Sequence, residues 1–223
     1  MDANYNRRTF LRTAGGAAVA GAASTKLLAR ESGTLIVGVS CSPRQGKTTA
    51  AAVKIALQAA QETDPRISTE LIDLGGKKIN GWTPPVEGQS VDDDFQALIP
   101  RLEADNLAGL IIGSPVYFRN MSSLCGAFLE RLSVLRSPKM LLADKAVGVL
   151  SVGGYRNGGQ ELVLQQIQTA MLCHECVIVG GKPGAFQGAT LWNAYEDDIT
   201  KDEFGIESAK KLGIRVAGAA LGG

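Results

Sequence analysis

The stretch TLIVGVSCSPRQGKTT, residues 34–49, decides how the rest of this chain is interpreted. Residues 35–39 form an apolar, β-branched-rich run without polar alternation, which is typical of a strand buried on both faces of a parallel sheet. Residues 49–60, TAAAVKIALQAA, are rich in helix formers and carry one apolar face. The loop between them offers hydroxyls, the cations Arg44 and Lys47, and the free amides of a helix amino end. The stretch therefore predicts a phosphate site.

Three kinds of phosphate loop compete for this stretch, and an ordinary turn is the alternative to all of them. A nucleoside triphosphate loop matches at residues 46–48, but Cys41 stands where that loop needs glycine and Pro43 removes an amide. A cysteine phosphatase loop needs arginine six residues after Cys41, where this chain has Lys47. A flavodoxin-like loop wraps the monophosphate of FMN with hydroxyls and amides, and no residue of the stretch contradicts it.

The rest of the chain alternates strands and helices without a repeat or linker, which indicates one doubly wound α/β domain. Further strands are expected at residues 68–74, 107–113, 145–152 and 176–179, and further helices at residues 95–104, 122–135, 160–172 and 203–217. Three of these strands run into loops, at residues 75–91, 114–121 and 153–159, while residues 180–198 look irregular. Open α/β sheets bind ligands at such strand ends. In the second of these loops, Tyr117 and Phe118 could pack against a planar ring or simply cover the core.

Composition and the amino end bound the function. A net charge of +1, without a basic block interleaved with aromatics, gives no reason to expect nucleic acid as a partner. Residues 6–12, NRRTFLR, precede a small-residue run that is too short to span a membrane and resembles a twin-arginine export signal. We expect residues 1–30 to be this signal and residues 31–223 the folded domain, with the mature chain beginning between Ala23 and Arg30. The expected location is the periplasm, or the cytoplasm if the amino end is only a basic tail.

The acidic, cysteine and histidine residues give no metal site. Cys173 and Cys176 flank the single histidine, His174, so a disulfide or half of a metal site is conceivable, but small buried side chains are the favoured interpretation. Residues 92–94, all aspartates, fit a solvated helix cap better than a metal site. A catalytic triad would have only one candidate base and no serine motif.

Three loops together resemble one family in order and spacing. The segments GVSCSPRQGKTT, GSPVYFRNMSSLCGAFLERL and SVGGYRNGGQE resemble the NADPH-dependent FMN reductase-like proteins of the flavodoxin-like superfamily, over residues 34–180, and look closest to the iron–sulfur flavoprotein branch. The resemblance implies a flavodoxin-like three-layer α/β/α sandwich with a five-stranded parallel sheet in the order 2-1-3-4-5. It also implies a homodimer or homotetramer.

The resemblance also assigns the cofactor FMN and the residues that bind it. The flavin itself carries the electron chemistry, so no catalytic side chain is expected. The residues that the resemblance assigns to the FMN phosphate are Ser42, Arg44, Thr48 and Thr49. The residues that the resemblance assigns to the lining of the flavin ring are Pro115, Val116, Tyr117, Phe118, Asn120, Met121, Ser151, Gly153, Gly154, Arg156 and Gly159.

The sequence departs from the iron–sulfur branch in two ways. That branch carries a compact cysteine cluster after the second strand, but residues 74–91 contain no cysteine, so no iron–sulfur cluster is expected. Arg119 stands where the family usually has a small or neutral residue, and a cation beside a flavin stabilises negative charge on the reduced ring.

These observations predict an FMN-dependent oxidoreductase, of the NAD(P)H- or quinone-reductase type, that passes electrons between a donor and an acceptor. The resemblance implies NAD(P)H as donor, whereas export favours a redox protein or a small quinone-like molecule as the partner. One alternative is a flavodoxin-like electron carrier without a substrate of its own. Another is a phosphohydrolase that uses Cys41.

Overall fold

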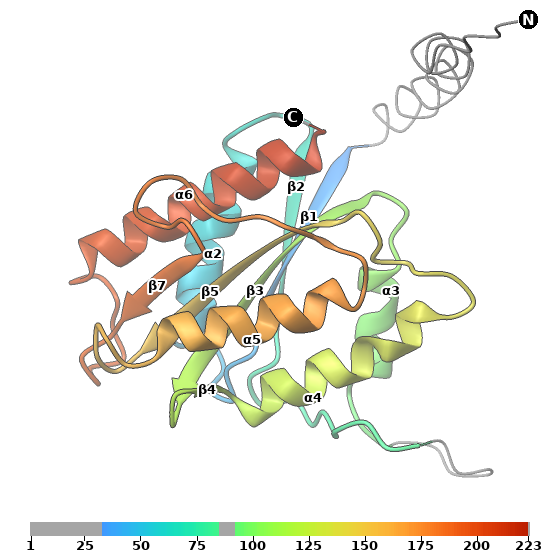
Figure 1. The fold of residues 1–223 in the computed structure, drawn as a ribbon, viewed down its shortest axis with the longest axis horizontal. Helices are drawn as coiled ribbons and strands as arrows, with labels where there is room; N and C mark the ends of the chain where they lie inside the picture. The colour runs from blue at the N-terminus through green and yellow to red at the C-terminus, as the bar shows by residue number, and fades with distance from the viewer. Residues whose placement is uncertain (1–32, 85–91, 223) are drawn as a thin grey trace, which may run out of the picture. The chain divides into compact units, whose positions relative to one another are not determined.

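A parallel sheet runs through the middle of the described chain, and helices cover both of its faces (Figure 1). The computed structural model describes residues 33–84 and 92–222, so the expected signal peptide and part of the loop at residues 75–91 lie outside the described residues. The principal strands are β1 (Thr34–Ser40), β2 (Ile67–Asp73), β3 (Leu107–Tyr117) and β5 (Ala146–Gly153).

The strand order confirms the flavodoxin-like prediction, but the sheet has seven strands instead of five. The order is β2-β1-β3-β5-β6, with β4 (Asn120–Met121) paired to β3 and β7 (Ala189–Trp192) paired to β5. The expected fifth strand is only two residues long in β6 (Val177–Ile178), which pairs with the start of β5. The chain then leaves the sheet and returns as β7, which pairs with the end of β5. Two short strands therefore share the position that one strand was expected to fill.

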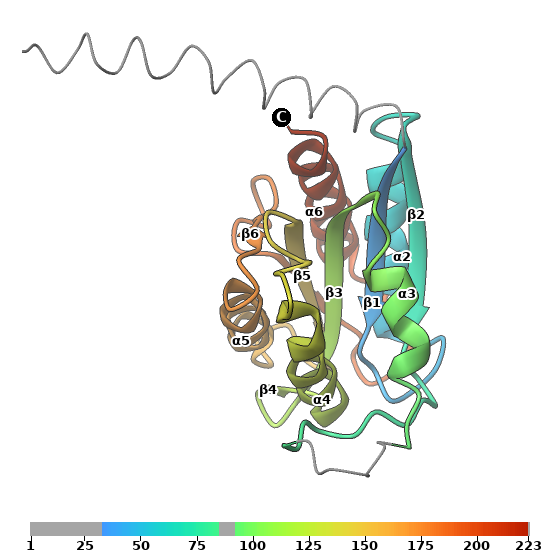
Figure 2. The same cartoon turned by 90° about the vertical axis from the view of Figure 1, so that its right-hand side faces the viewer.

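The helices divide between the two faces of the sheet. Figure 1 and the turned view in Figure 2 agree that α2 (Thr48–Gln61) and α6 (Glu203–Ala220) lie on one face. The other face carries α3 (Ile99–Leu102), α4 (Ser123–Arg131) and α5 (Gln160–Leu172). None of the helices in the described part of the chain has the length and apolar character needed to cross a bilayer.

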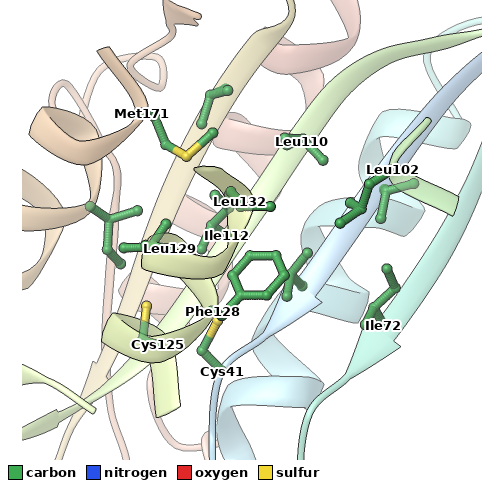
Figure 3. Packing of buried hydrophobic residues seen from close by; sticks show 14 of the residues in the cluster. Cys41, Ile72, Leu102, Leu110, Ile112, Cys125, Phe128, Leu129, Leu132 and Met171 are labelled. Atoms are coloured by element: carbon green, nitrogen blue, oxygen red, sulfur yellow. The ribbon is translucent and has the colours of Figure 1, made fainter. Parts of the chain in front are cut away.

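The central strands are apolar throughout because both of their faces are buried. Within β1, Val37 and Val39 face the α3–α5 side, whereas Ile36 faces α2 and α6. Figure 3 shows Phe128 of α4 and Leu132, which directly follows α4, packed against Ile112 of β3 on the first of these faces. The continuous apolar pattern of residues 35–39 thus reflects two cores, one on each side of the sheet.

Two predicted helices are shorter than their patterns suggested. Residues 95–104 form a short 3-10 helix, η1 (Gln96–Leu98), followed by the single turn of α3. Residues 122–135 form α4, which continues as a second 3-10 helix, η2 (Leu132–Arg136). Both segments bury most of their apolar side chains, among them Leu98, Leu102, Phe128 and Leu132, so the periodicity identified the buried face but not the helix type.

Asp93 is not the solvated cap residue that the sequence suggested. Its carboxylate is fully buried and pairs with the guanidinium of Arg131 on α4, which is 6% exposed. The same carboxylate accepts hydrogen bonds from the backbone amides of Asn80 and Phe95. Burial by itself would raise the pKa of Asp93, but these hydrogen bonds and the Arg131 charge outweigh burial and hold it below its ordinary value. Asp93 therefore pins the loop after β2 to α4.

We expect Asp93→Asn to lower the free energy of unfolding by about 3–5 kcal/mol, because it leaves Arg131 buried without a counter-charge. Asp92→Asn is the matched control: Asp92 is exposed and its oxygen lies 3.5 Å from Lys78 Nζ, so its loss should cost under about 1 kcal/mol. Urea unfolding followed by circular dichroism measures both. Equal effects of the two changes would contradict a structural role for the buried pair.

The same pair predicts a pH dependence with a definite sign. A folded-state pKa below the unfolded value means that Asp93 stabilises the fold above pH ~4, and that this contribution is lost as pH falls through the folded pKa. Wild type should therefore lose more stability than Asp93→Asn when the pH is lowered from about 5 to about 3.

Candidate functional site

The loop between β1 and α2 lies at the carboxyl end of the sheet and presents buried hydroxyls beneath an uncapped helix. Ser42, Thr48 and Thr49 are 2%, 4% and 1% exposed. Lys47, the residue before α2, makes no side-chain cap, and the amides of the first helical turn find no acceptor among the described residues. The hydroxyl of Ser40, at the end of β1, is also buried without a partner in the described chain. These unsatisfied polar groups suit an anion.

Asp73, at the end of β2, holds the shape of this loop. Its carboxylate accepts hydrogen bonds from the amides of Gly46 at 2.7 Å and Gly75 at 3.1 Å. A Cβ on Gly75 would lie 2.3 Å from the backbone of Gln45, so only glycine allows the two segments to approach this closely. The loop is therefore fixed by its neighbours before any ligand binds.

The predicted second loop is mostly a β-hairpin. Pro115 is a buried residue of β3 that pairs with Val152, and Val116 and Tyr117 continue the strand to pair with Met121 and Asn120 of β4. Proline is tolerated at this point of β3 because β1 pairs with β3 only as far as Gly113, so Pro115 lies beyond the end of that ladder. The expectation of an irregular loop at residues 114–121 is therefore wrong for all but its tip.

The tip of this hairpin is strained and exposed. Phe118 and Arg119 have positive φ angles of 50° and 62°, a conformation that side-chain-bearing residues seldom adopt. The Phe118 side chain is 100% exposed and Tyr117 is 39% exposed, so neither covers the core. The interpretation of these two aromatics as core residues is wrong, and a role against a ring stays a prediction.

Buried serines connect the hairpin to the two loops beside it. Ser122 Oγ donates to the carbonyl of Cys41 at 2.6 Å, and the amide of Ser122 donates to Ser114 Oγ at 3.0 Å. Ser151 Oγ donates to the carbonyl of Ser114 at 3.1 Å. The predicted flavin residue Ser151 is fully buried, so its hydroxyl joins two strands. One chain of hydrogen bonds thus sets the positions of all three loops.

The third loop, residues 153–159, is organised by Gln160. Its side chain accepts from the amide of Gly158 at 2.9 Å and donates to the carbonyls of Tyr155 at 2.5 Å and Leu191 at 3.0 Å. Gly159 has a φ of 113°, and a Cβ there would lie 3.1 Å from the backbone of Arg119. The third loop and the hairpin tip are therefore in close contact.

Arg156 points to the other side of this loop. Its guanidinium pairs with Asp202 at the start of α6, donates to the carbonyl of Thr190 at 3.1 Å, and lies over the rings of Trp192 and Phe204. Burial lowers the pKa of Arg156. The guanidinium thus attaches the third loop to α6, and a flavin contact by Arg156 stays a prediction.

Sequence reasoning missed a fourth segment, residues 193–198, which follows β7 and looked irregular. Asp197 pairs with Arg44 and with Lys47, whose Nζ lies 3.4 Å from Asp197 Oδ2. Hydrogen bonds from these two cations lower the pKa of Asp197. The ring of Tyr195 packs edge-on against Tyr155, with centroids 5.1 Å apart. No signal in the sequence joins residues so far apart along the chain.

The cysteines do not supply a nucleophile. Cys41 is fully buried, and burial raises the pKa of its thiol well above the ordinary value, with Cys125 and Asp73 raising it further. The phosphohydrolase alternative is therefore wrong, because it needs an accessible thiolate. Cys173 and Cys176 are free thiols; Cys173 is exposed, contrary to expectation, while Cys176 is buried and burial raises its pKa to about 11. No group of metal-ligating side chains occurs in the described ranges.

The residues at the sheet edge fit FMN. The buried hydroxyls and the unpaired amides at the start of α2 suit its phosphate. Gly159 brings the third loop against the hairpin at Arg119, where an added Cβ would lie 3.1 Å from the backbone. Ser42, Thr48 and Thr49 would hold the phosphate, with the hairpin and the third loop beside the ring. The individual flavin contacts stay predictions.

Comparison with known proteins shows the family and the fold of the chain. Residues 34–190 match the family described as NADPH-dependent FMN reductase. An iron–sulfur flavoprotein of Methanocaldococcus jannaschii is 36% identical over 189 residues, covering 82% of this chain and 95% of that protein. One from Methanosarcina thermophila is 33% identical over 180 residues, covering 79% and 92%. The solved structure of a WrbA-like flavodoxin from Agrobacterium tumefaciens shares the fold, with a TM-score of 0.57 at 19% identity, covering 85% and 97%. The chain belongs to the NADPH-dependent FMN reductase family and is an FMN-dependent, flavodoxin-like oxidoreductase.

Proposed function

We propose that this oxidoreductase is exported and that it passes electrons to a small quinone-like acceptor at the exposed hairpin tip. The observation that supports this proposed acceptor is a hollow of about 620 Å³ beside that tip. It is bordered by Arg119 and Gly159 and by three apolar side chains that are partly exposed, Leu162, Phe186 and Phe204. A hollow of this size, with two aromatic rings among polar lining residues, suits a small planar molecule.

The charge of Arg119 supports the same acceptor. No ion pair or hydrogen bond of its side chain occurs within residues 33–84 and 92–222, and its backbone lies against Gly159 of the third loop. A free cation at this place attracts an acceptor that is anionic or becomes so on reduction. When bound, FMN supplies the transfer of electrons, while the chain positions it and shapes the hollow.

The proposal is tested by anaerobic reoxidation of the purified protein. We expect absorption near about 450 nm from bound flavin, bleaching with dithionite, and recovery on adding a naphthoquinone with a rate that saturates. An electron carrier without its own substrate would give a reoxidation rate that rises linearly with the quinone concentration. A protein that fails to take up FMN would contradict the cofactor itself, and an additional cluster absorption would contradict the prediction that no iron–sulfur centre is present.

Arg119→Gln should weaken the apparent affinity for a sulfonated naphthoquinone about two- to fivefold, as expected for one exposed charge, and leave a neutral benzoquinone little changed. Arg215→Gln, a change of the same charge at an exposed position of α6, is the control. The same reoxidation assay gives both constants. Equal losses for the two quinones would assign Arg119 a role in shaping the tip instead of attracting the acceptor.

Export rests on the amino end and conflicts with a nicotinamide donor, because no such pool is maintained outside the inner membrane. Changing Arg7 and Arg8 to lysine should keep the full-length, flavin-loaded protein in the cytoplasm, since export depends on the arginine pair whereas folding does not. Cell fractionation with an antibody measures this. If the unaltered protein stays in the cytoplasm with residues 1–22 attached, NAD(P)H becomes the expected donor. A homodimer or homotetramer stays a prediction from the family.

A further inference from the structure

The segment between β7 and α6 contacts the phosphate loop at three side chains. The carboxylate of Asp197 bridges Arg44 and Lys47. Asn193 Nδ2 donates to Thr48 Oγ1 at 3.4 Å, so the segment also engages one of the hydroxyls expected to hold phosphate. These contacts join residues about 150 positions apart and occur only in the folded chain.

The conformation of residues 193–198 fixes the position of the Asp197 carboxylate. Asn193 Oδ1 accepts from the amide of Tyr195 at 3.0 Å. The Tyr195 ring lies over Gly154, where an added Cβ would be 2.4 Å from it. Asp197 itself has a φ of 55°. The third loop therefore supports the segment from one side while Asp197 reaches the phosphate loop on the other.

The charges of this arrangement bear directly on phosphate binding. Arg44 and Lys47 are the cations of the loop, and Asp197 pairs with both, while Asp73 places a second carboxylate on the amide of Gly46. Two positive and two negative side chains thus meet at a loop that must accept a phosphate of about −1.5 to −2 charge at pH 7. The cations are already paired before the phosphate arrives.

We propose that Asp197 sets the affinity of the FMN site by occupying the phosphate-loop cations in competition with the flavin phosphate. The inference rests on FMN binding with its phosphate at residues 42–49. The side chains of Arg44, Lys47 and Asp197 are 48%, 49% and 38% exposed, so each ion pair is weak and the phosphate can displace the carboxylate. As a result FMN binds less tightly, and is released more readily, than the hydroxyls, amides and cations alone would allow.

The test is the dissociation constant of FMN for the full-length apoprotein, measured by quenching of flavin fluorescence. Asp197→Asn should tighten FMN binding about five- to thirtyfold, which corresponds to the loss of two exposed ion pairs. Riboflavin, which lacks the phosphate, should be unaffected. Asp198→Asn is the matched control, because it makes the same change of charge one residue away, where the carboxylate accepts hydrogen bonds from Thr200 and pairs with neither Arg44 nor Lys47. It should change neither constant.

A second pair of variants separates competition from positioning. If Asp197 instead orients Arg44 toward the phosphate, Asp197→Asn weakens FMN binding, and the inference is overturned. In an Arg44→Ala background, Asp197→Asn should increase the affinity for FMN by a smaller factor, because the substitution then frees only Lys47 from its ion pair. An unchanged gain would also overturn the inference.

Other outcomes are equally decisive. Asp197→Ser, which keeps a small polar side chain without charge, should tighten FMN binding in the same direction. If circular dichroism shows both Asp197 variants unfolded, Asp197 is structural and the inference fails. An unaltered protein that binds no FMN would refute the assigned cofactor, whereas FMN binding that is indifferent to Asp197→Asn would refute this inference alone.

Discussion

The site depends on one short set of hydrogen bonds between buried serines. Ser122 donates to the carbonyl of Cys41 in the first loop and receives an amide hydrogen bond from Cys125 at the start of α4. Through Ser114 the same set reaches Ser151 at the end of β5. Loops that come from β1, β3 and β5 are thus held at fixed separations by groups that water cannot reach. A cofactor that touches all three loops meets a site that is already formed.

Electrostatics divide this edge of the sheet into two regions. At the start of α2, Arg44 and Lys47 are balanced by Asp197, so the phosphate region carries cations that are already paired. At the hairpin tip, Arg119 has no such partner within the described residues, and both apolar and polar side chains border the hollow beside it. The first region suits a cofactor that is held by many weak contacts. The second suits a partner that arrives from solvent.

Burial also excludes the role of nucleophile that the sequence alone suggested for Cys41, and an ion pair gives Arg156 a supporting role. Cys41 occupies the place of a phosphatase nucleophile in the sequence, yet its thiol lies in the core beneath α4 (Figure 3). Arg156 and Asp202 form a pair that holds the third loop to α6 instead of facing the hairpin. Whether a polar residue near the site can bind a ligand or instead supports the fold thus depends on where its side chain points. Residue type alone does not determine that direction.

The sequence by itself determined the principal strands and the loops after β1 and β5, while the strand order followed from the resemblance to a family. Periods of hydrophobicity are local, so the buried runs in β1, β3 and β5 and the limits of α5 were recognisable within windows of a few residues. The phosphate loop was recognisable for the same reason, since its hydroxyls and cations are neighbours in the chain. Only the tertiary structure decided that the fifth position is shared by β6 and β7, that Asp93 is buried against Arg131, and that Asp197 reaches Arg44. These features join residues 38 and 153 positions apart, or depend on where the chain leaves and rejoins the sheet. Such contacts arise from the way whole layers pack, and no local pattern encodes them.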